Sequence, residues 1–568
     1  MSDQLRILII GGYGEFGGRL AELLLRDGHS VIVAGRRLSK AEQFCDQHGG
    51  EPLELDINTD LQVVATLGVH VVVDAAGPFQ SYGANHDKYH VALAALNCGA
   101  HYLDLCDDGN FTQGIAALDS AAKKQNRFAL SGASSTPALS AAAVNSVQAQ
   151  FSSMIKIETS ILPGSRAPQG YSVMQAILVQ VGNPVTFWRN NAWTECRGWS
   201  EPSLKSVDTK VTRQANLITA ADVVLFPEHF KVQSVLFRAG LALPVMHKSL
   251  QWLGALRQLG WLPELTTFIK PLRWLANRIT PFGSDHGGML VEVIGEQVGA
   301  LVSNKTERSI STSKPDLLHC SWHLKAEPGY GPYVPTIAVR ALIRNIDSLT
   351  PGARPCIEEL PLEQYVEAMQ DIPVTTNFTE HAFNYLFQIT LGESWLALPT
   401  PLRESHKVVD RITLSGNAKV SRGTSPLTSL VAWVFRFPAA CESISVQVVK
   451  TRIGDSEIWE RNFDGQIFRS TLTYIHRESN NQTSSNHQHP VIQEQFGLMK
   501  FLLELPVVDG AMHMNVLSGS CLGIPIPGWL LPVSNTFEYV LDEHMHFCVE
   551  LLGPLKTGLI VRYEGSLK

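Results

Sequence analysis

The first 130 residues alternate short apolar runs with amphipathic stretches. Helical patterns, such as residues 17–27, separate apolar runs at 6–10, 31–33, 52–55, 69–73, 101–105 and 128–130. The first run is aliphatic from Ile7 to Ile10, as expected of a strand covered on both faces. Strands that alternate with helices in this way predict a doubly wound parallel sheet. We therefore predict an N-terminal Rossmann domain over residues 1–150.

The pattern changes twice farther along the chain. Residues 151–355 mix strand-like and helical segments and predict an α/β substrate domain, in which residues 231–279 are helical and basic. Residues from about 355 to 385 carry Pro, Glu and Thr, and we interpret them as a linker. Beyond it, the alternating runs and the turn Asp464-Gly465 predict a mainly antiparallel β (α+β) domain over residues 380–568, with a short helix near 425–435.

Bulk composition narrows the possible partners. A chain of 568 residues exceeds what one hydrophobic core supports, which agrees with several domains. The net charge of -7 gives no general attraction to nucleic acid, so we expect no nucleic-acid partner. Nine scattered cysteines without CxxC spacing predict reduced thiols, no metal site and a cytoplasmic location. A homodimer is left open.

The basic segment 231–279 has two interpretations. It places tryptophans among leucines and basic residues, a composition that suits an apolar substrate tunnel or an anionic membrane surface. The alternative is a set of helices packed on the core with solvated arginines. No apolar run is continuous over the roughly 20 residues that a membrane-spanning helix needs. We expect at most a peripheral membrane contact through this segment.

A glycine-rich turn follows the first apolar run and opens the first helical pattern. This strand–turn–helix context is the one that a dinucleotide-binding fingerprint requires. Small residues let the backbone approach a pyrophosphate, whose charge then faces the amides at the helix N-terminus. A turn that binds nothing is the alternative. We expect the cofactor to contact Gly11, Gly12, Tyr13, Gly14, Glu15, Phe16 and Gly17.

The end of the second strand bears on the choice of cofactor. An NAD-binding fold usually places Asp or Glu there to bond the ribose hydroxyls. This chain has Arg36 and Arg37 instead and no acid. A carboxylate would repel a ribose 2′-phosphate, whereas arginine pairs with it through two parallel hydrogen bonds. We therefore expect NADP(H) in preference to NAD(H), although solvated surface arginines are the alternative.

Two more strand ends should contribute to the cofactor site. In a doubly wound sheet, the ligand crevice lies beyond the carboxyl ends of the strands. Ala76, Gly77 and Pro78 follow the fourth strand and leave room for the ribose and nicotinamide. Asp56 follows the third strand, where it is placed either to accept a bond from the adenine amine or to close a surface turn.

Several of these segments resemble a known family. GGYGEFGG, VAGRR, AAGPF and HYLDLCDDG resemble the NADP-binding domains of saccharopine dehydrogenase-like proteins. From about Thr379 to the end, the chain resembles an uncharacterised domain of the DUF4166 type, on VSRG at 420–423 and WERNF at 459–463. The resemblance implies an NAD(P)-binding oxidoreductase. It does not identify the substrate, because this broad group also contains lipid enoyl reductase-like members.

Three residues are candidate proton donors. Hydride transfer to a carbonyl, imine or enoyl group needs a proton donor near the reacting atoms. Tyr102 and Asp104 end the fifth strand, and we expect both to face the crevice. His286 stands in a glycine-rich turn before a strand of the second domain. A structural hydrogen bond is the alternative role for each of them.

These observations predict an NADP(H)-dependent oxidoreductase acting on a hydrophobic or lipid-like carbonyl or enoyl substrate. The rival hypothesis is a non-catalytic NADP(H)-sensing or scaffold protein that retains the Rossmann fold. Fold alone does not separate the two.

Overall fold

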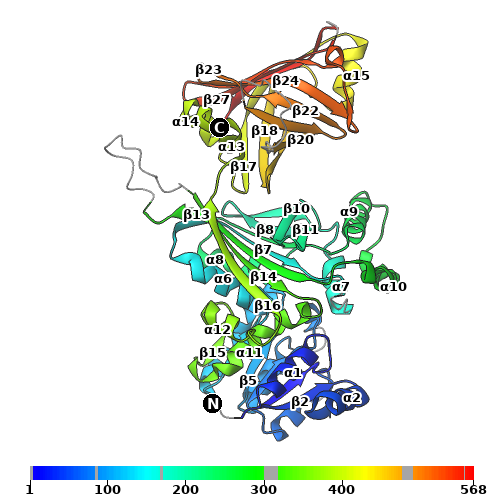
Figure 1. The fold of residues 1–568 in the computed structure, drawn as a ribbon, viewed down its shortest axis with the longest axis vertical. Coiled ribbons are helices and arrows are strands. Elements are labelled where there is room, and N and C mark those ends of the chain that lie inside the picture. Colours follow the sequence, from blue (N-terminus) through cyan, green and yellow to red (C-terminus); the bar gives the residue numbers. More distant parts are fainter. Residues whose placement is uncertain are drawn as a thin grey trace. The chain divides into compact units, whose positions relative to one another are not determined.

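The computed structural model describes residues 4–59, 61–83, 87–166, 171–299, 317–475, 490–554 and 557–568 (Figure 1). The chain divides into two compact units, Met1–Ala382 and Phe383–Lys568. The first unit contains two sheets, and the second contains one. The predicted fold class is confirmed: an N-terminal Rossmann-type sheet, a mixed second sheet and a C-terminal antiparallel barrel.

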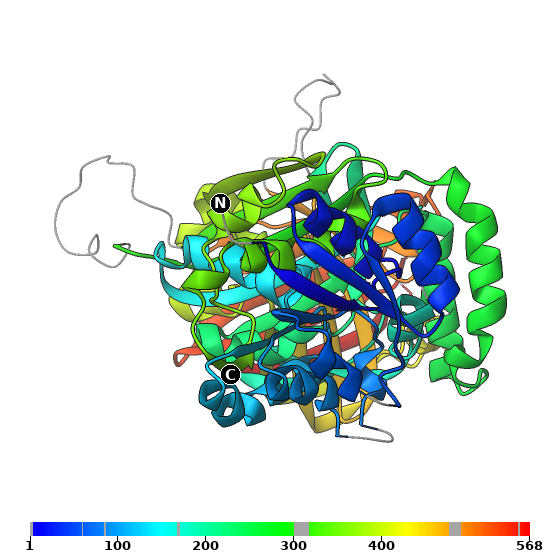
Figure 2. The ribbon, with the colours of Figure 1, turned by 90° about the horizontal axis from the view of Figure 1, so that it is seen from below.

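The first sheet is parallel throughout and has helices on both faces (Figure 2). Along each strand, alternate side chains enter two separate apolar cores: Ile7 and Ile9 enter one, and Leu8 and Ile10 the other. All six predicted strands are present. In sheet order, the strands are β15 (Gly352–Pro355), β6 (Phe128–Ser131), β5 (His101–Asp104), β4 (Val71–Asp74), β1 (Arg6–Ile10), β2 (Ser30–Gly35) and β3 (Glu51–Glu54).

Short helices connect these strands. In chain order they are α1 (Gly17–Arg26), α2 (Leu38–His48), α3 (His90–Asn97), α4 (Gly109–Gly114), α5 (Asp119–Lys124) and α6 (Ser140–Gln148).

The second sheet is mixed and shares a core with the first. Helices α6 and α8 (Ala221–Phe230) contact it. Buried Asp222 accepts hydrogen bonds from Ser140 Oγ at 3.0 Å and Thr159 Oγ1 at 2.7 Å, which joins α8 to α6 and to the sheet. Its strands are β10 (Ser203–Asp208), β11 (Val211–Leu217), β12 (Ser234–Ala239), β7 (Phe151–Leu162), β13 (Gly287–Gln297), β14 (Leu317–Ala326) and β16 (Val374–Ala382), with β8 (Pro184–Arg189) and β9 (Ala192–Arg197) beside β12.

The predicted linker is wrong. Residues 352–355 form β15, which pairs in parallel with β6 and so returns the chain to the first sheet. Helix α12 (Leu362–Glu367) buries Leu362 and Tyr365, and β16 pairs along its whole length with β14. Residues 352–382 therefore belong to the structured part of the first unit.

The segment 231–279 is only partly helical, contrary to the prediction. Residues 234–239 form β12 inside the second sheet, where buried Arg238 donates to Glu158 at 2.7 Å. Helices α9 (Pro244–Gln258) and α10 (Ile269–Ile279) follow, and Trp252, Trp261 and Trp274 in this region are 62–74% exposed. Among the described residues, no helix is long and apolar enough to cross a membrane. Peripheral membrane contact stays a prediction.

The second unit is a closed antiparallel barrel. Strand β22 pairs with both β21 and β24, which closes the ring. The predicted hairpin is confirmed: Asp464 and Gly465 have φ of 46° and 91° and join β19 to β20. The strands are β17 (Arg411–Arg422), β18 (Cys441–Ile453), β19 (Ser456–Phe463), β20 (Gln466–Tyr474), β21 (Val491–Phe496), β22 (Met499–Glu504), β24 (Ala511–Cys521), β26 (Val533–Leu541), β27 (His544–Leu552) and β28 (Leu559–Leu567), with the short β23 (Val507–Val508) and β25 (Ile524–Pro525) at β24.

Three helices accompany the barrel. Helices α13 (Leu386–Leu391) and α14 (Thr400–Glu404) precede its first strand, and α14 contacts β26 and β27. Helix α15 (Pro426–Val434) agrees with the predicted helix near 425–435 and contacts β28.

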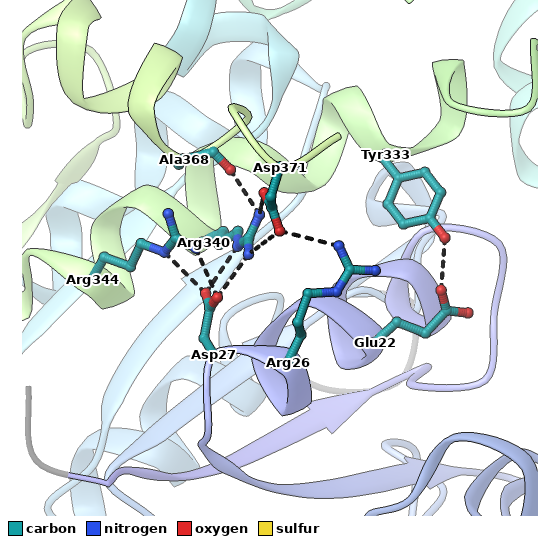
Figure 3. A network of polar contacts seen from close by, with 8 residues as sticks. All are labelled: Glu22, Arg26, Asp27, Tyr333, Arg340, Arg344, Ala368 and Asp371. Carbon is teal, nitrogen blue, oxygen red and sulfur yellow. Dashed lines mark hydrogen bonds and ion pairs between the residues drawn. The ribbon is translucent and has the colours of Figure 1, made fainter. Parts of the chain in front are cut away.

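An ion cluster fixes the far end of α1 (Figure 3). Asp27 caps this helix, where the negative end of the helix dipole disfavours an acid. Arg340 of α11 (Ile337–Arg344) donates to both oxygens of Asp27, at 2.9 and 2.7 Å, and also bonds Asp371 and the carbonyl of Ala368. Arg344 adds two more bonds to Asp27. Residues about 310 positions apart in sequence thus hold α1 in place.

We predict that Arg340→Met destabilises the first unit by about 3 kcal/mol, because Asp27 and Asp371 lose their shared buried partner and keep only the more exposed Arg344 and Arg26. Urea denaturation followed by circular dichroism measures the loss. The matched control is Arg26→Gln, because Arg26 bonds the same Asp371 at 3.1 Å but is 51% exposed, so its loss costs about 1 kcal/mol or less. Equal effects of the two substitutions would show that burial of Arg340 is not what matters.

Candidate functional site

The turn after β1 leaves no room for a side chain at its glycine positions. The amide of Gly14 donates to the carbonyl oxygen of Gly11 at 2.8 Å, and α1 begins at Gly17. A Cβ atom on Gly17 would lie 2.2 Å from that same oxygen, and one on Gly14 would lie 2.9 Å from it. Gly12 is enclosed in the same way, with Ile9 O at 2.8 Å. The helix therefore starts directly against the turn, as a pyrophosphate cradle requires.

The turn lies at the point where the strand order of the first sheet reverses. Strands β1 and β4 are neighbours, and the sheet continues from them in opposite directions. Across this point a Cβ on Gly11, whose φ is 75°, would lie 2.8 Å from Ala75 O. Parallel sheets bind ligands at such a reversal, outside the carboxyl ends of the strands.

Two exposed arginines stand at the end of β2. Within the described part of the chain, neither Arg36 nor Arg37 forms an ion pair. The backbone N–H of Arg37 donates to Tyr13 Oη at 3.1 Å. The Tyr13 ring lies over Gly35, where an added Cβ would come within 2.5 Å of a ring carbon. Tyr13 thus ties the glycine turn to the arginine pair.

The remaining predicted cofactor residues lie in turns around the same edge. The amide of Ala76 donates to Asp74 Oδ1 at 3.0 Å, and Gly77, which precedes Pro78, has φ of 37°. Glu15 is exposed and pairs with Arg19 at 3.3 Å, while Phe16 is the residue before α1.

Asp56 is used in its own turn. Its Oδ1 accepts bonds from the backbone and side-chain nitrogens of Asn58, at 3.0 and 3.1 Å. The contact of Asp56 with an adenine stays a prediction.

Two buried carboxyls sit side by side at the ends of β4 and β5. Asp74 and Asp104 are partners in the strand register, and each holds the loop that follows its strand. Asp104 Oδ1 accepts from Cys106 N, Gly132 N and Ser131 Oγ at 2.8–3.0 Å. Burial raises the pKa of Asp74 to about 6 and that of Asp104 to about 7.

Asp74 also receives a tyrosine. Tyr82 Oη donates to both oxygens of Asp74, at 3.2 and 3.1 Å, and the Tyr82 ring lies 5.1 Å from the ring of Phe79. The loop that carries Ala76, Gly77 and Pro78 is therefore held at both ends.

The structure separates the three predicted proton donors. Tyr102 is 1% exposed and belongs to the apolar core with Leu8 and Val72, so the expectation that it faces the crevice is wrong. Asp104 lies at the expected edge but is fully buried, with Oδ2 lacking a hydrogen-bond partner among the described residues. His286 retains exposure, and its Nε2 lies 3.2 Å from Glu327 Oε2.

The turn that carries His286 is connected to α1 through the segment at Gly331–Thr336. A Cβ atom added to the adjacent Gly287 would lie 3.5 Å from the Cα atom of Gly331. The helical turn Gly331–Thr336 in turn packs on α1. In that turn, Tyr333 Oη donates to Glu22 of α1 at 2.6 Å.

Sequence reasoning missed two contacts of this site. The Tyr13–Gly35 contact and the Tyr82–Asp74 pair both join residues from different turns. The Tyr13–Gly35 contact has a sequence signal, which is a small residue at the end of β2 together with an aromatic residue in the glycine turn. The second has no local signal, because it depends on how the loop after β4 folds back.

Comparison with known proteins identifies two domains. Residues 7–131 match the saccharopine dehydrogenase NADP binding domain, and residues 398–567 match a domain of unknown function, DUF4166. No curated protein matches the chain. The resemblance drawn from the sequence is confirmed, and the N-terminal domain is an NADP-binding domain.

Two solved structures match about two thirds of the chain at low similarity. Apo saccharopine dehydrogenase (L-Glu forming) from Saccharomyces cerevisiae is 12% identical, with 66% of this chain and 100% of that chain covered and a TM-score of 0.46. A probable dehydrogenase from Thermotoga maritima is 11% identical, with 64% and 93% covered and a TM-score of 0.32. The assignment of the domains rests on the two family matches.

We predict that Asp104 makes the first unit less stable as the pH rises. The folded pKa of about 7 lies above the ordinary value of 3.8, so the folded protein holds a proton that the unfolded chain releases. The stabilisation is fully present below pH ~4 and is lost as the pH rises through ~7. Urea denaturation of the parent and Asp104→Asn at pH 5 and pH 8 tests this.

The free energy of unfolding of the parent, relative to the neutral variant, should fall by about 1–3 kcal/mol between the two pH values. A difference that stays constant, or grows at pH 8, would mean that Asp104 is ionised at pH 5.

Proposed function

We propose that this chain, which joins a saccharopine dehydrogenase NADP-binding domain to a DUF4166 domain, is an NADP(H)-dependent oxidoreductase that acts on a carbonyl or enoyl group of an apolar substrate. The single observation that carries the choice of cofactor is the exposed pair Arg36 and Arg37 at the end of β2, where an NAD-binding site would have an acid.

The chemistry of the arginine pair supports this choice. Guanidinium groups bind phosphate through two parallel hydrogen bonds, and neither guanidinium is engaged in an ion pair within the described residues. Tyr13 holds the backbone at Arg37, which fixes where the two side chains begin. The pair therefore suits a 2′-phosphate on the adenosine ribose.

The other residues of the site would hold and orient the cofactor. The glycine turn suits a pyrophosphate because, without side chains at Gly14 and Gly17, the amides at the start of α1 lie directly at the turn. Asp74 and Asp104 keep the loops after β4 and β5 in place. A nicotinamide cofactor supplies or accepts a hydride when bound. His286 is the predicted proton donor that keeps solvent exposure, and Glu327 positions its ring.

An apolar substrate is supported by the surface of the same unit. Three large apolar side chains within residues 252–282 are highly exposed, and exposed apolar surface is a common feature of binding sites. Trp252 and Trp261 are 72% and 74% exposed, and Phe282 is 83% exposed.

One observation favours the rival function, which is NADP(H) sensing without catalysis. Tyr102 and Asp104 are fully buried, and His286 is engaged with Glu327. A protein whose proton donors are enclosed or paired would bind the cofactor and leave it unchanged. Tight binding of NADPH is common to both functions, and hydride transfer belongs only to the first.

We predict that the chain binds NADPH at least about tenfold more tightly than NADH, equivalent to about 1.4 kcal/mol, through Arg36 and Arg37. The double substitution Arg36→Ala and Arg37→Ala should remove the preference by weakening NADPH binding while leaving NADH binding unchanged. Tryptophan fluorescence titration measures both affinities.

The control for charge alone is Lys124→Ala, an exposed lysine of α5, and it should keep the preference. Equal affinities in the parent, or a double variant that still prefers NADPH, would place the 2′-phosphate site elsewhere.

A further inference from the structure

The barrel of the second unit encloses a cavity of about 140 Å³. Its walls are inward side chains of the strands, and most of them are apolar. Val446 and Val448 come from β18, Phe501 from β22 and Phe547 from β27, and all four are less than 10% exposed. A well-formed apolar cavity with a few convergent polar groups is the usual form of a small-molecule site.

The polar groups gather deep in the barrel. Lys450 Nζ is fully enclosed and donates to Ser405 O at 2.9 Å and to His406 Nδ1 at 3.3 Å. His406 Nε2 in turn lies 2.7 Å from Glu538 Oε2. Burial lowers the pKa of His406 to about 4, which leaves a neutral ring that can accept from Lys450 and donate to Glu538.

A second cation faces the same cavity. Arg461 Nη1 donates to Ser470 Oγ at 2.8 Å, and its Nη2 lies 3.4 Å from Glu494 Oε1. The Trp459 ring contacts both cations, with Lys450 Nζ at 4.1 Å and the guanidinium carbon of Arg461 at 5.1 Å from its centroid.

Unused hydrogen-bond donors remain on the two cations of the lining. Lys450 has three N–H groups and bonds two acceptors among the described residues, and Arg461 has five N–H groups and bonds two. A ligand atom that accepts hydrogen bonds would therefore find unused donors here.

The charges of the lining decide what kind of acceptor fits. Lys450 and Arg461 contribute two positive charges, and Glu494 and Glu538 contribute two negative charges, so the lining is neutral in sum. A charged head group would enter a buried site without a counter-charge, which is costly. A neutral oxygen, such as a carbonyl, accepts a hydrogen bond without adding charge.

The other end of the cavity is apolar and partly open. The lining residues that keep some exposure include Phe435, beside α15, and Phe496, whose rings lie 6.0 Å apart. Exposed apolar residues are close to these in sequence: Leu498 follows Phe496 by two residues, its carbonyl oxygen accepts from the amide of Leu522, and both leucines are at least 65% exposed. Trp433 of α15 is 75% exposed. An entry route with this composition favours an apolar ligand.

The volume limits the size of the ligand. An apolar cavity of about 150 Å³ holds one benzene ring, so a site of this size takes a molecule with about six to nine non-hydrogen atoms. From Val446 to Lys450, the wall of β18 extends over four residues, or about 13 Å, which gives such a molecule enough depth. A long acyl chain does not fit inside.

We propose that the C-terminal barrel binds a small, neutral, mostly apolar molecule, whose one carbonyl oxygen accepts a hydrogen bond from Lys450 while its apolar body packs against Val448, Phe501 and Phe547. This site lies wholly within residues 383–568 and does not depend on the function proposed for the first unit.

Acetophenone, ethylbenzene and benzoate are the probes for the full chain, measured by ligand-observed NMR. They share one aromatic ring and differ in the polar group. We expect acetophenone to bind at one site and benzoate to bind at least tenfold more weakly. Lys450→Met should weaken acetophenone about tenfold and leave ethylbenzene within about twofold, since only acetophenone accepts a hydrogen bond.

Cavity-filling variants test the location. Val448→Phe, and independently Val516→Phe at the partly open end, should weaken acetophenone and ethylbenzene at least tenfold. The matched control Val508→Phe lies outside the cavity lining, is 51% exposed and should change neither. Circular dichroism establishes that each variant is folded, and only folded variants are compared.

Three results would overturn the proposal. They are the absence of binding by acetophenone and ethylbenzene up to their solubility, binding that both folded filling variants leave unchanged, and tighter binding of benzoate than of acetophenone. The last would mean an anionic ligand. None of these results bears on NADPH binding by the first unit, so the two proposals fail separately.

Discussion

No side-chain atom fits between Gly17 and the carbonyl oxygen of Gly11, and the rest of the first unit is arranged around that contact. A Cβ at Gly17 would lie 2.2 Å from the oxygen, so α1 begins directly against the turn that follows β1. Its other end is held at Asp27 by Arg340 and Arg344. With both ends fixed, the amides at the start of α1 keep a constant position at the reversal of the strand order, which is where parallel sheets bind ligands.

The second fixed end has a consequence for the domain organisation. Arg340 lies in α11, after the second sheet, and the chain then adds β15 to the first sheet. The two sheets are therefore not successive domains joined by a linker. The part of the chain after the second sheet completes the first sheet and secures its cofactor helix, and only the barrel is a separate unit.

The sequence predicts the elements whose pattern is local. The strands of the first sheet are apolar on both faces, and the glycine turn and the Asp464-Gly465 hairpin have their own chemistry, so each is recognised without its partners. Strand β15, GARP, has no apolar run, so nothing in its own sequence predicts that it joins the first sheet. Strand β16 lies in the predicted linker and alternates among mostly polar residues, so it resembles a linker until β14 pairs with it. Likewise, nothing in the sequence near Arg238 distinguishes it from a surface arginine, because its partner Glu158 is 80 residues away in the chain.

The candidate site, like the fold, was predictable only where a residue's role is indicated by its neighbours in sequence. Glycines or arginines that directly follow a strand of a doubly wound sheet indicate a dinucleotide site by their position alone. The turn at residues 11–17 and the pair Arg36 and Arg37 were therefore expected. The direction of a side chain near a strand end is not local information. Tyr102 points into the core and Asp104 is enclosed by the loops it holds, and neither follows from their place in HYLDLCDDG.

The central claim is that the chain transfers hydride and does not only bind NADP(H). Its most direct test uses NADPH carrying deuterium at C4 of the nicotinamide, incubated with the full chain and a panel of apolar aldehydes, ketones and enoyl compounds. The account predicts that deuterium appears on carbon in at least one reduced product, as detected by mass spectrometry. It also predicts that Gly14→Val, which blocks the pyrophosphate cradle, abolishes the transfer. NADPH that binds tightly but keeps all its deuterium in the presence of every compound would contradict the account and favour a sensor.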